Sequence, residues 1–184
     1  MLERDTTVLL VVDFQERLLP KITNADKIIC QASALIRFAR LLKIPILLTE
    51  QYRKGLGPTH PNVLAALEDV PPIEKMAFSC FGEGRFVDAL AATSRRQLLV
   101  VGVETHVCVL QTVLDALKRD LEVFVVQDAL GSRAVAQRDA GLARMRQRGA
   151  DIVTVEMAVF ELLRQAGTED FRAALPLIKE IAKE

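Results

Sequence analysis

The stretch VVGVETHVCVLQT, residues 100–112, holds the sharpest local pattern of the chain. An apolar run ends at Val103 and apolar residues at helical spacing follow, so the stretch predicts a buried strand, a tight turn and a helix. Thr105 is placed to cap this helix, with Cys108 in its first turn. Unpaired amides and the dipole at a helix start favour a thiolate over a thiol. The pattern fits a reactive thiol, and a small buried cysteine is the alternative.

Apolar runs like the one at 98–103 recur along the chain. They are rich in Val, Leu and Ile without strict alternation, which is typical of strands buried on both faces of a parallel sheet. Helical stripes lie between them, for example over 28–42 and 110–117. Alternating strands and helices predict right-handed crossovers and a three-layer αβα domain. The other four runs span residues 8–12, 44–48, 123–126 and 152–155.

The remaining segments complete one predicted domain over residues 1–184, a length that supports a single core. A helix beginning near Val135 is expected to end before Gly149. Residues 51–72 are punctuated by Gly and Pro and predict a loop with a short helix at 62–67. The segment 171–181 predicts a closing helix.

Lysine plus arginine equal aspartate plus glutamate at 24 each, so the balance of charge favours neither nucleic acid nor an anionic membrane as partner. A small molecule is the expected ligand. No run approaches the roughly 20 apolar residues that span a bilayer, and the first residues are unlike a signal peptide. Three cysteines without a CxxC pair predict a reducing, cytoplasmic setting.

Parallel α/β sheets bind ligands beyond the carboxyl ends of their strands. The segment 13–20 that follows the first strand has no glycine-rich turn, so no dinucleotide cofactor is expected. The polar residues expected at or near strand ends are Asp13, Glu50, Lys75, Glu104 and Asp128.

Three motifs, VVDFQ (11–15), EKMAFSCF (74–81) and GVETHVCVLQT (102–112), together resemble the cysteine-hydrolase branch of the isochorismatase-like family over nearly the whole chain. Residues 49–59 and 132–154 are most similar to the subgroup called isochorismatase domain-containing proteins. The resemblance implies a Rossmann-like αβα fold with a mainly parallel six-stranded sheet in the order 3-2-1-4-5-6. The first and fourth strands are then neighbours.

Carried onto this chain, the resemblance implies a triad of Asp13, Lys75 and Cys108. Cys108 would be the nucleophile, Asp13 its base, and the Lys75 ammonium would stabilise the thiolate. The family also has a cis peptide that would join Val103 to Glu104 here, and the amides of Glu104 and Cys108 would form an oxyanion hole. The implied reaction is metal-independent hydrolysis of a small amide, imide or carbamoyl C–N bond through a thioester.

A second set of residues is predicted to surround the substrate. Gln15 is placed to orient Asp13 or the substrate, and a surface position is its alternative. The roles of His106, Glu50 and Cys80 stay open. The residues expected to line the pocket are Leu18, Gln51, Tyr52 and Phe78.

Nicotinamidases of this family bind a metal through an Asp and two His residues after the second strand. Here Gln51 and Arg53 stand where the Asp and the first His are expected, which leaves His60. No metal or cofactor is therefore predicted, and nicotinamide is a weaker candidate substrate. Self-association into a homo-oligomer is implied by the resemblance.

Two other functions compete with hydrolysis. A non-catalytic scaffold or interaction protein would keep the fold and a residual site. A redox-sensing role for Cys108 is weakened by the lack of a resolving cysteine nearby in the sequence.

Overall fold

The structure is a computed structural model that describes residues 1–181. Its centre is a six-stranded sheet in the order β3-β2-β1-β4-β5-β6, and every neighbouring pair is parallel. The predicted fold class and strand order are confirmed, with a sheet that is wholly parallel. The strands are β1 (Thr7–Val12), β2 (Ile46–Gln51), β3 (Pro72–Lys75), β4 (Gln97–Val103), β5 (Glu122–Gly131) and β6 (Asp151–Val153).

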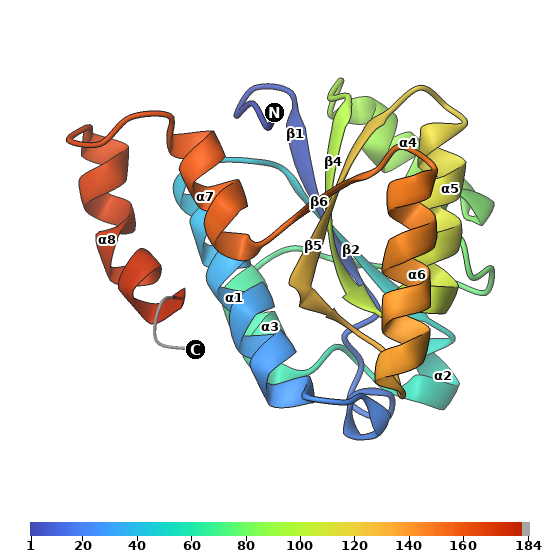
Figure 1. The fold of residues 1–184 in the computed structure, drawn as a ribbon. Coiled ribbons are helices and arrows are strands. Elements are labelled where there is room, and N and C mark those ends of the chain that lie inside the picture. The colour runs from blue at the N-terminus through green and yellow to red at the C-terminus, as the bar shows by residue number, and fades with distance from the viewer. Residues whose placement is uncertain (182–184) are drawn as a thin grey trace.

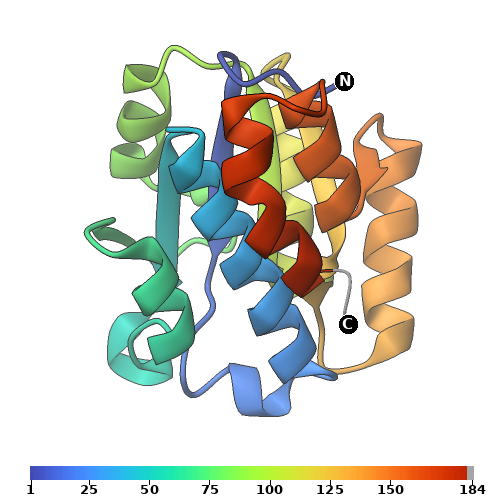
Figure 2. The ribbon, with the colours of Figure 1, turned by 90° about the vertical axis from the view of Figure 1, so that its left-hand side faces the viewer.

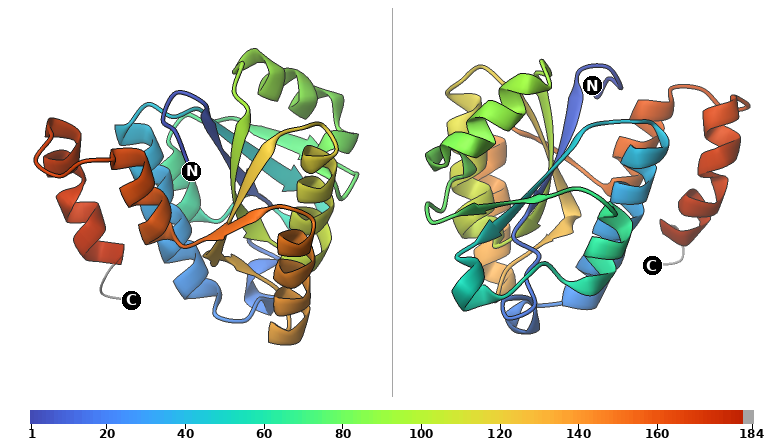
Figure 3. Two further views of the ribbon diagram at one scale, coloured as in Figure 1. Left: turned by 45° about the horizontal axis from the view of Figure 1, so that its top comes forward. Right: turned by 180° about the vertical axis from the view of Figure 1, so that it is seen from behind.

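Helices cover both faces of the sheet (Figure 1). On one face lie α1 (Ala25–Leu41), α3 (Pro61–Leu67), α7 (Val155–Leu163) and α8 (Glu169–Ile181), and on the other lie α4 (Gly84–Ala92), α5 (Leu110–Leu117) and α6 (Val135–Gln147). Figure 2 shows α1 in front of the sheet with α8 outside it, and Figure 3 shows the same layering from two further sides. Within residues 1–181, no helix is long and apolar enough to cross a membrane.

The central strand β1 explains why its apolar run does not alternate. Leu9 and Val11 pack into the core under α1, whereas Leu10 and Val12 pack into the core under α4, α5 and α6. All six residues of β1 are buried. Burying one such side chain stabilises the fold by roughly 1.5–3 kcal/mol, so an apolar residue is favoured at successive positions.

Two strands differ most from their predicted bounds. The second was expected over 44–48, but β2 runs from Ile46 to Gln51 because its polar end pairs with β3, and Thr49 also pairs with β1. The fifth was expected to end at Asp128, yet β5 continues to Gly131. The Asp128 carboxylate instead accepts a hydrogen bond from the N–H of Val155 at 2.9 Å, at the start of α7. Hydrophobicity does not detect a strand that continues through polar residues.

The helices agree more closely with the sequence prediction. The stripe at 110–117 is α5, and α6 begins at Val135 as expected. Gly149 has φ of +100°, which suits the predicted stop after α6. The short helix expected at 62–67 and the closing helix expected at 171–181 are α3 and α8.

Gly102 allows β1 and β4 to approach closely beside the turn that carries Cys108. Its φ is +143°, and a Cβ at this position would lie 2.4 Å from the backbone oxygen of Val12. The pairing of Val12 with Gly102 lies directly before Asp13. A side chain at position 102 would therefore push the two strand ends apart.

Candidate active site

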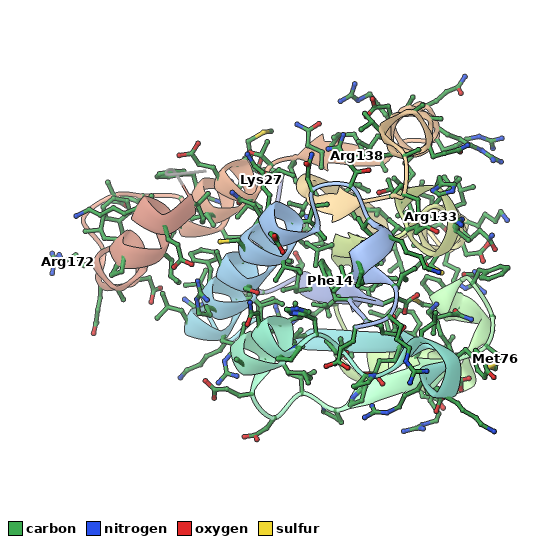
Figure 4. The ribbon with its side chains drawn as sticks, turned by 90° about the horizontal axis from the view of Figure 1, so that it is seen from below. Phe14, Lys27, Met76, Arg133, Arg138 and Arg172 are labelled. Atoms are coloured by element: carbon green, nitrogen blue, oxygen red, sulfur yellow. The ribbon has the colours of Figure 1, made fainter. Side chains whose placement is uncertain are left out.

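The sheet brings Asp13, Lys75 and Cys108 to one edge. Asp13 directly follows β1, Lys75 is the last residue of β3, and Cys108 lies in the π-helical turn Thr105–Val109 after β4. The three strands end on the same side because the sheet is parallel. Figure 4 views the molecule from that side, with Phe14, the neighbour of Asp13, near the middle.

Lys75 is held by three strong acceptors. Its Nζ donates to Asp13 Oδ2 at 2.8 Å, to Gln51 Oε1 at 2.7 Å and to the backbone oxygen of Phe78 at 3.1 Å. The residue is only 1% exposed. Burial lowers the pKa of Lys75, but the negative charge of Asp13, the largest opposing effect, helps to outweigh it, so that pKa is raised. The side chain is thus a fixed, buried ammonium rather than a surface charge.

The Asp13 carboxylate is oriented by two donors. Lys75 binds Oδ2, and the Thr49 hydroxyl donates to Oδ1 at 2.8 Å. The backbone N–H of Asp13 also donates to the oxygen of Thr49 at 3.1 Å. Thr49 was not predicted as a site residue. The signal that could have found it is its polarity beside Glu50, but that signal requires β2 to extend past Leu48.

Cys108 is 7% exposed and lies in the electrostatic field of both partners. Burial raises the pKa of its thiol, the Asp13 charge raises it further, and Lys75 offsets only part of this. The expected preference for a resting thiolate is therefore wrong in this structure, because desolvation disfavours the charged form. Thr105 is not the predicted cap either: it lies inside the turn, and its hydroxyl donates to the backbone oxygen of Gly131 at 2.9 Å.

The structure adds a second buried thiol to this cluster. The N–H of Cys80 donates to the Thr112 hydroxyl at 3.0 Å, and Thr112 lies one helical turn beyond Cys108. Cys80 Sγ is 3.9 Å from the Thr49 hydroxyl. Burial, followed by the Asp13 charge, raises the pKa of Cys80 to about 11. Cys80 is far from Cys108 in the sequence but belongs to the same cluster. The lack of a second cysteine near Cys108 in the sequence is therefore no argument against a partner thiol.

The turn ahead of Cys108 contains the predicted oxyanion residues. The peptide bond between Val103 and Glu104 is cis. The Glu104 carboxylate accepts from the N–H and Nε of Arg133 at 3.0 and 3.1 Å. His106 Nδ1 lies 3.0 Å from Ser132 Oγ. The side chains of Glu104 and His106 therefore tie this turn to the loop after β5.

The predicted substrate-lining residues fall into two groups. Tyr52 and Phe78 are 44% and 53% exposed, and Met76, which was not predicted and lies close to Phe78 in the sequence, is 67% exposed. Figure 4 shows Met76 at the outer margin of the edge view. Leu18 is half-buried and packs against the core. Apolar side chains thus remain accessible in the segments that follow β2 and β3.

The amide side chains of Gln51 and Gln15 are engaged within the protein. Gln51 Nε2 donates to the oxygen of Met76 at 2.8 Å, while its Oε1 accepts from Lys75. Gln15 is buried and binds the N–H and oxygen of Gln51 and the oxygen of Gly57. Gln15 is therefore not on the surface, and it fastens the loop after β2 to the end of β1.

The residues after β2 do not form a metal site. Glu50 is buried and accepts from the N–H and hydroxyl of Thr59 at 2.7 Å each, and it pairs with Arg53. His60 Nδ1 accepts from the N–H of Asn62 at the start of α3. In the part of the chain that the structure describes, no three His, Cys, Asp or Glu side chains are grouped to hold a metal ion. Gln51 and Glu50 instead make internal hydrogen bonds, so this donor set does not fit the family's metal.

A parallel sheet with a buried acid, amine and thiol at its carboxyl edge defines an α/β protein with a polar site at the strand ends. Residues 7–157 match the family model described as Isochorismatase domain, and the chain belongs to this family. The resemblance predicted from the three sequence motifs is confirmed. Membership of this family supports a hydrolase activity.

Curated relatives and solved structures agree with this assignment. Isochorismatase domain-containing protein 2A from Mus musculus is 39% identical over 181 residues, 96% of this chain and 84% of the relative. The secreted isochorismatase effector Isc1 from Phytophthora sojae is 38% identical over 97% of this chain and 87% of its own length.

Three solved structures share the fold closely. MAR1 ribonuclease from Caenorhabditis elegans superposes with a TM-score of 0.91 at 36% identity, covering 97% of this chain and 92% of its own. YcaC from Escherichia coli, described as an octameric hydrolase of unknown specificity, gives 0.92 at 31% identity with 99% and 91% covered. YcaC from Pseudomonas aeruginosa, with hexane-2,5-diol and covalent acrylamide, gives 0.90 at 32% identity with 99% and 94% covered.

Proposed function

We propose that the protein is a metal-independent cysteine hydrolase that cleaves the C–N bond of a small amide, imide or carbamoyl compound. The observation that carries this proposal is the contact of Lys75 with Asp13 at 2.8 Å, in a buried cluster that also acts electrostatically on Cys108. A buried acid and amine beside a thiol supply what a cysteine nucleophile needs, namely a base and a compensating cation.

Because the pKa of Cys108 is raised, the first step must combine proton transfer with nucleophilic attack. The resting thiol is protonated, so the proton passes to Asp13 as Sγ attacks the carbonyl carbon. The new S–C bond gives a tetrahedral intermediate whose oxyanion is stabilised by the backbone amides of Glu104 and Cys108. Lys75 keeps its proton and balances the charge.

The second half of the reaction returns the site to its starting state. The C–N bond breaks, and the leaving nitrogen takes the proton from Asp13 to depart as ammonia or an amine. Water then attacks the thioester carbonyl while Asp13 accepts one of its protons. Breaking the S–C bond releases the acid, and Cys108 regains the proton.

A relative gives indirect support for a reactive nucleophile in this fold. The Pseudomonas aeruginosa YcaC structure holds covalent acrylamide, a small primary amide. This chain shares 32% identity and nearly its whole length with that protein. Acrylamide is an alkylating agent, so we infer that a protein of this fold can carry a reactive nucleophile, the role that we propose for Cys108. Tyr52, Met76 and Phe78 supply exposed apolar surface in the adjoining segments.

The proposal is tested by screening small primary amides and carbamoyl compounds for ammonia release, and imides for product formation by mass spectrometry, with Cys108→Ala as the matched control. An activity that Cys108→Ala lacks supports the assignment. A screen in which both proteins release ammonia equally from every compound that reacts would contradict it. RNA is tested in a separate assay of strand cleavage, which releases no ammonia, because solved relatives carry the name ribonuclease. The balanced charge of this chain gives no general attraction for a polyanion.

One observation favours a non-catalytic alternative: Cys108 is 7% exposed and its pKa is raised, as in an inert structural cysteine. The screen separates the two, because a scaffold releases no ammonia from any compound. We further propose self-association, supported by the octameric relative from Escherichia coli. A reducing, cytoplasmic setting also remains a proposal, supported by three cysteines that form no disulfide.

A further inference from the structure

The ammonium of Lys75 has all of its N–H donors engaged inside the protein. An ammonium carries three donors and no acceptor. Lys75 Nζ donates to Asp13 Oδ2 at 2.8 Å, to Gln51 Oε1 at 2.7 Å and to the backbone oxygen of Phe78 at 3.1 Å. Since every donor is used in this way, Lys75 acts on Cys108 through its charge rather than through a hydrogen bond.

The side chain of Gln51 is oriented as a hydrogen-bond acceptor toward this ammonium. Gln51 is the last residue of β2 and lies opposite Lys75 in the register of β2 and β3. Its Nε2 donates to the oxygen of Met76 at 2.8 Å, and its backbone N–H donates to Gln15 Oε1 at 2.7 Å. Turning the amide over would set its NH2 group against the ammonium and its oxygen against a carbonyl, so the two neighbours fix one orientation.

The oxygen that Gln51 presents to Lys75 carries no formal charge. Of the three acceptors around Nζ, only Asp13 is an acid, so one ammonium faces one carboxylate. The charged or titratable groups that act on the Cys108 thiol are Asp13, Lys75 and Cys80. If position 51 carried a carboxylate, one cation would face two acids, and a thiolate at Cys108 would add a third negative charge. A neutral acceptor therefore leaves more of the Lys75 charge to offset a thiolate.

We propose that Gln51 is a positioning residue of the thiol site: its neutral amide oxygen holds the Lys75 ammonium in place and leaves the charge of that ammonium to stabilise negative charge at Cys108. The consequence for turnover rests on the proposed hydrolase function. The consequence for the reactivity of Cys108 does not, because it can be measured without a substrate.

The experiment compares two replacements of Gln51 in the full-length protein. Gln51→Glu keeps the shape and adds a carboxylate, whereas Gln51→Met removes the acceptor and adds no charge. Gln111→Glu is the matched control, since it makes the same chemical change at an exposed position of α5, three residues after Cys108. The rate of alkylation of Cys108 by iodoacetamide is followed by peptide mass spectrometry between pH ~7 and ~10, with Cys30 as an internal reference.

Gln51→Glu should slow the alkylation of Cys108 by about tenfold or more at pH ~9, because the added negative charge disfavours the thiolate that reacts. The slowing should grow as the pH rises, since the introduced carboxyl loses its proton in that direction. Gln51→Met should stay within about threefold of wild type, because Lys75 keeps its charge. Gln111→Glu should react like wild type, since water screens an exposed charge.

Two results would overturn this role. The first is an alkylation rate in Gln51→Glu equal to that of wild type across the pH range. The second is equal slowing in Gln51→Glu and Gln51→Met, which would show that the shape of the side chain matters and its charge does not. The unfolding midpoint of each variant shows that it is folded, and the pair Gln51→Asp and Gln51→Asn replaces the first pair if Gln51→Glu is not.

Turnover gives the second readout. With an amide identified by ammonia release, kcat/KM should fall more in Gln51→Glu than in Gln51→Met, in the same order as the alkylation rates. If wild-type protein hydrolyses no amide, the proposed function fails while the alkylation series still decides the role of Gln51. The two failures are therefore distinguishable.

Discussion

Lys75 Nζ and Asp13 Oδ2 lie 2.8 Å apart, although the strands that carry them are separated by β2. Gln51, at the end of β2, accepts from the same ammonium and so fills the space between them. Both side chains are at most 1% exposed. Both charges are therefore removed from water, and each is stabilised in the interior by the other.

Removing one member of this pair should destabilise the fold strongly. Lys75→Met leaves a buried carboxylate without its cation, and we expect a loss of about 3–5 kcal/mol in the free energy of unfolding. Asp13→Asn/Lys75→Met should be more stable than the sum of the two single changes predicts, because it leaves no unpaired charge. Urea unfolding of the four proteins measures the coupling. Strictly additive losses would show that the two charges do not interact.

Replacing Asp13 should change the alkylation rate of Cys108 and the rate of hydrolysis in opposite directions. Because the Asp13 charge raises the pKa of Cys108, Asp13→Asn should speed alkylation of Cys108 by iodoacetamide at neutral pH while abolishing hydrolysis. Lys75→Met should slow alkylation, since Lys75 lowers that pKa. Peptide mass spectrometry gives the rate at Cys108, with Cys30 as an internal control. Slower alkylation in Asp13→Asn would show that the carboxylate activates the resting thiol.

Stability should fall in alkaline solution. The pKa of Cys80 is raised to about 11 and that of Cys108 is also raised, whereas an unfolded cysteine has a pKa near about 8.5. Below pH ~8.5 both states hold these protons, so the thiols add no pH dependence. Above it the unfolded state loses protons that the folded state keeps, which costs about 1.4 kcal/mol per pH unit for each thiol.

The raised pKa of Lys75 acts in the same direction at higher pH, with stability lost above the unfolded lysine value of about 10.4. Cys80→Ala and Cys108→Ala should each flatten the slope between pH ~8.5 and ~10. The free energy of unfolding, measured by urea titration across this range, is the test. A wild-type slope in the double variant would mean that neither thiol is protonated in the folded state at these pH values.

The sequence predicts the architecture from particular residues. The unalternating apolar run of β1 indicates a strand that is covered on both faces, and the single apolar stripe of α5 indicates a helix that packs on one side only. The polar ends of β2 and β5 were missed because Thr49, Glu50 and residues 127–131 are strand only through pairing with neighbours.

The site was predicted less completely, again because contacts between distant segments do not show in the local sequence. The strand pattern marked Asp13, Lys75 and the turn that carries Cys108, but only the family resemblance placed Lys75 beside the other two. Thr49 reaches the cluster through the register of β2 in the sheet, and Cys80 reaches it through the path of the segment after β3. No local sequence pattern encodes either arrangement. The direction of the Cys108 pKa shift depends on desolvation, and desolvation requires coordinates.

Gly102 should be indispensable for the geometry of the site. Gly102→Ala places a Cβ 2.4 Å from the Val12 oxygen at φ of +143°, so we expect a loss of about 2 kcal/mol or more in stability. Hydrolysis should fall further than stability does, because Asp13 moves with Val12. Gly84→Ala is a suitable control, since a Cβ there meets nothing within 4 Å. Equal stability of Gly102→Ala and Gly84→Ala would contradict the close approach of β1 and β4.

The most direct measurement is intact-protein and peptide mass spectrometry of acid-quenched protein during turnover of an amide identified by ammonia release. Cys108 should carry the acyl group of that substrate as a thioester, and Cys108→Ala should show neither the adduct nor ammonia release while keeping its fold. Undiminished ammonia release by folded Cys108→Ala would show that the sulfur at position 108 is not the nucleophile.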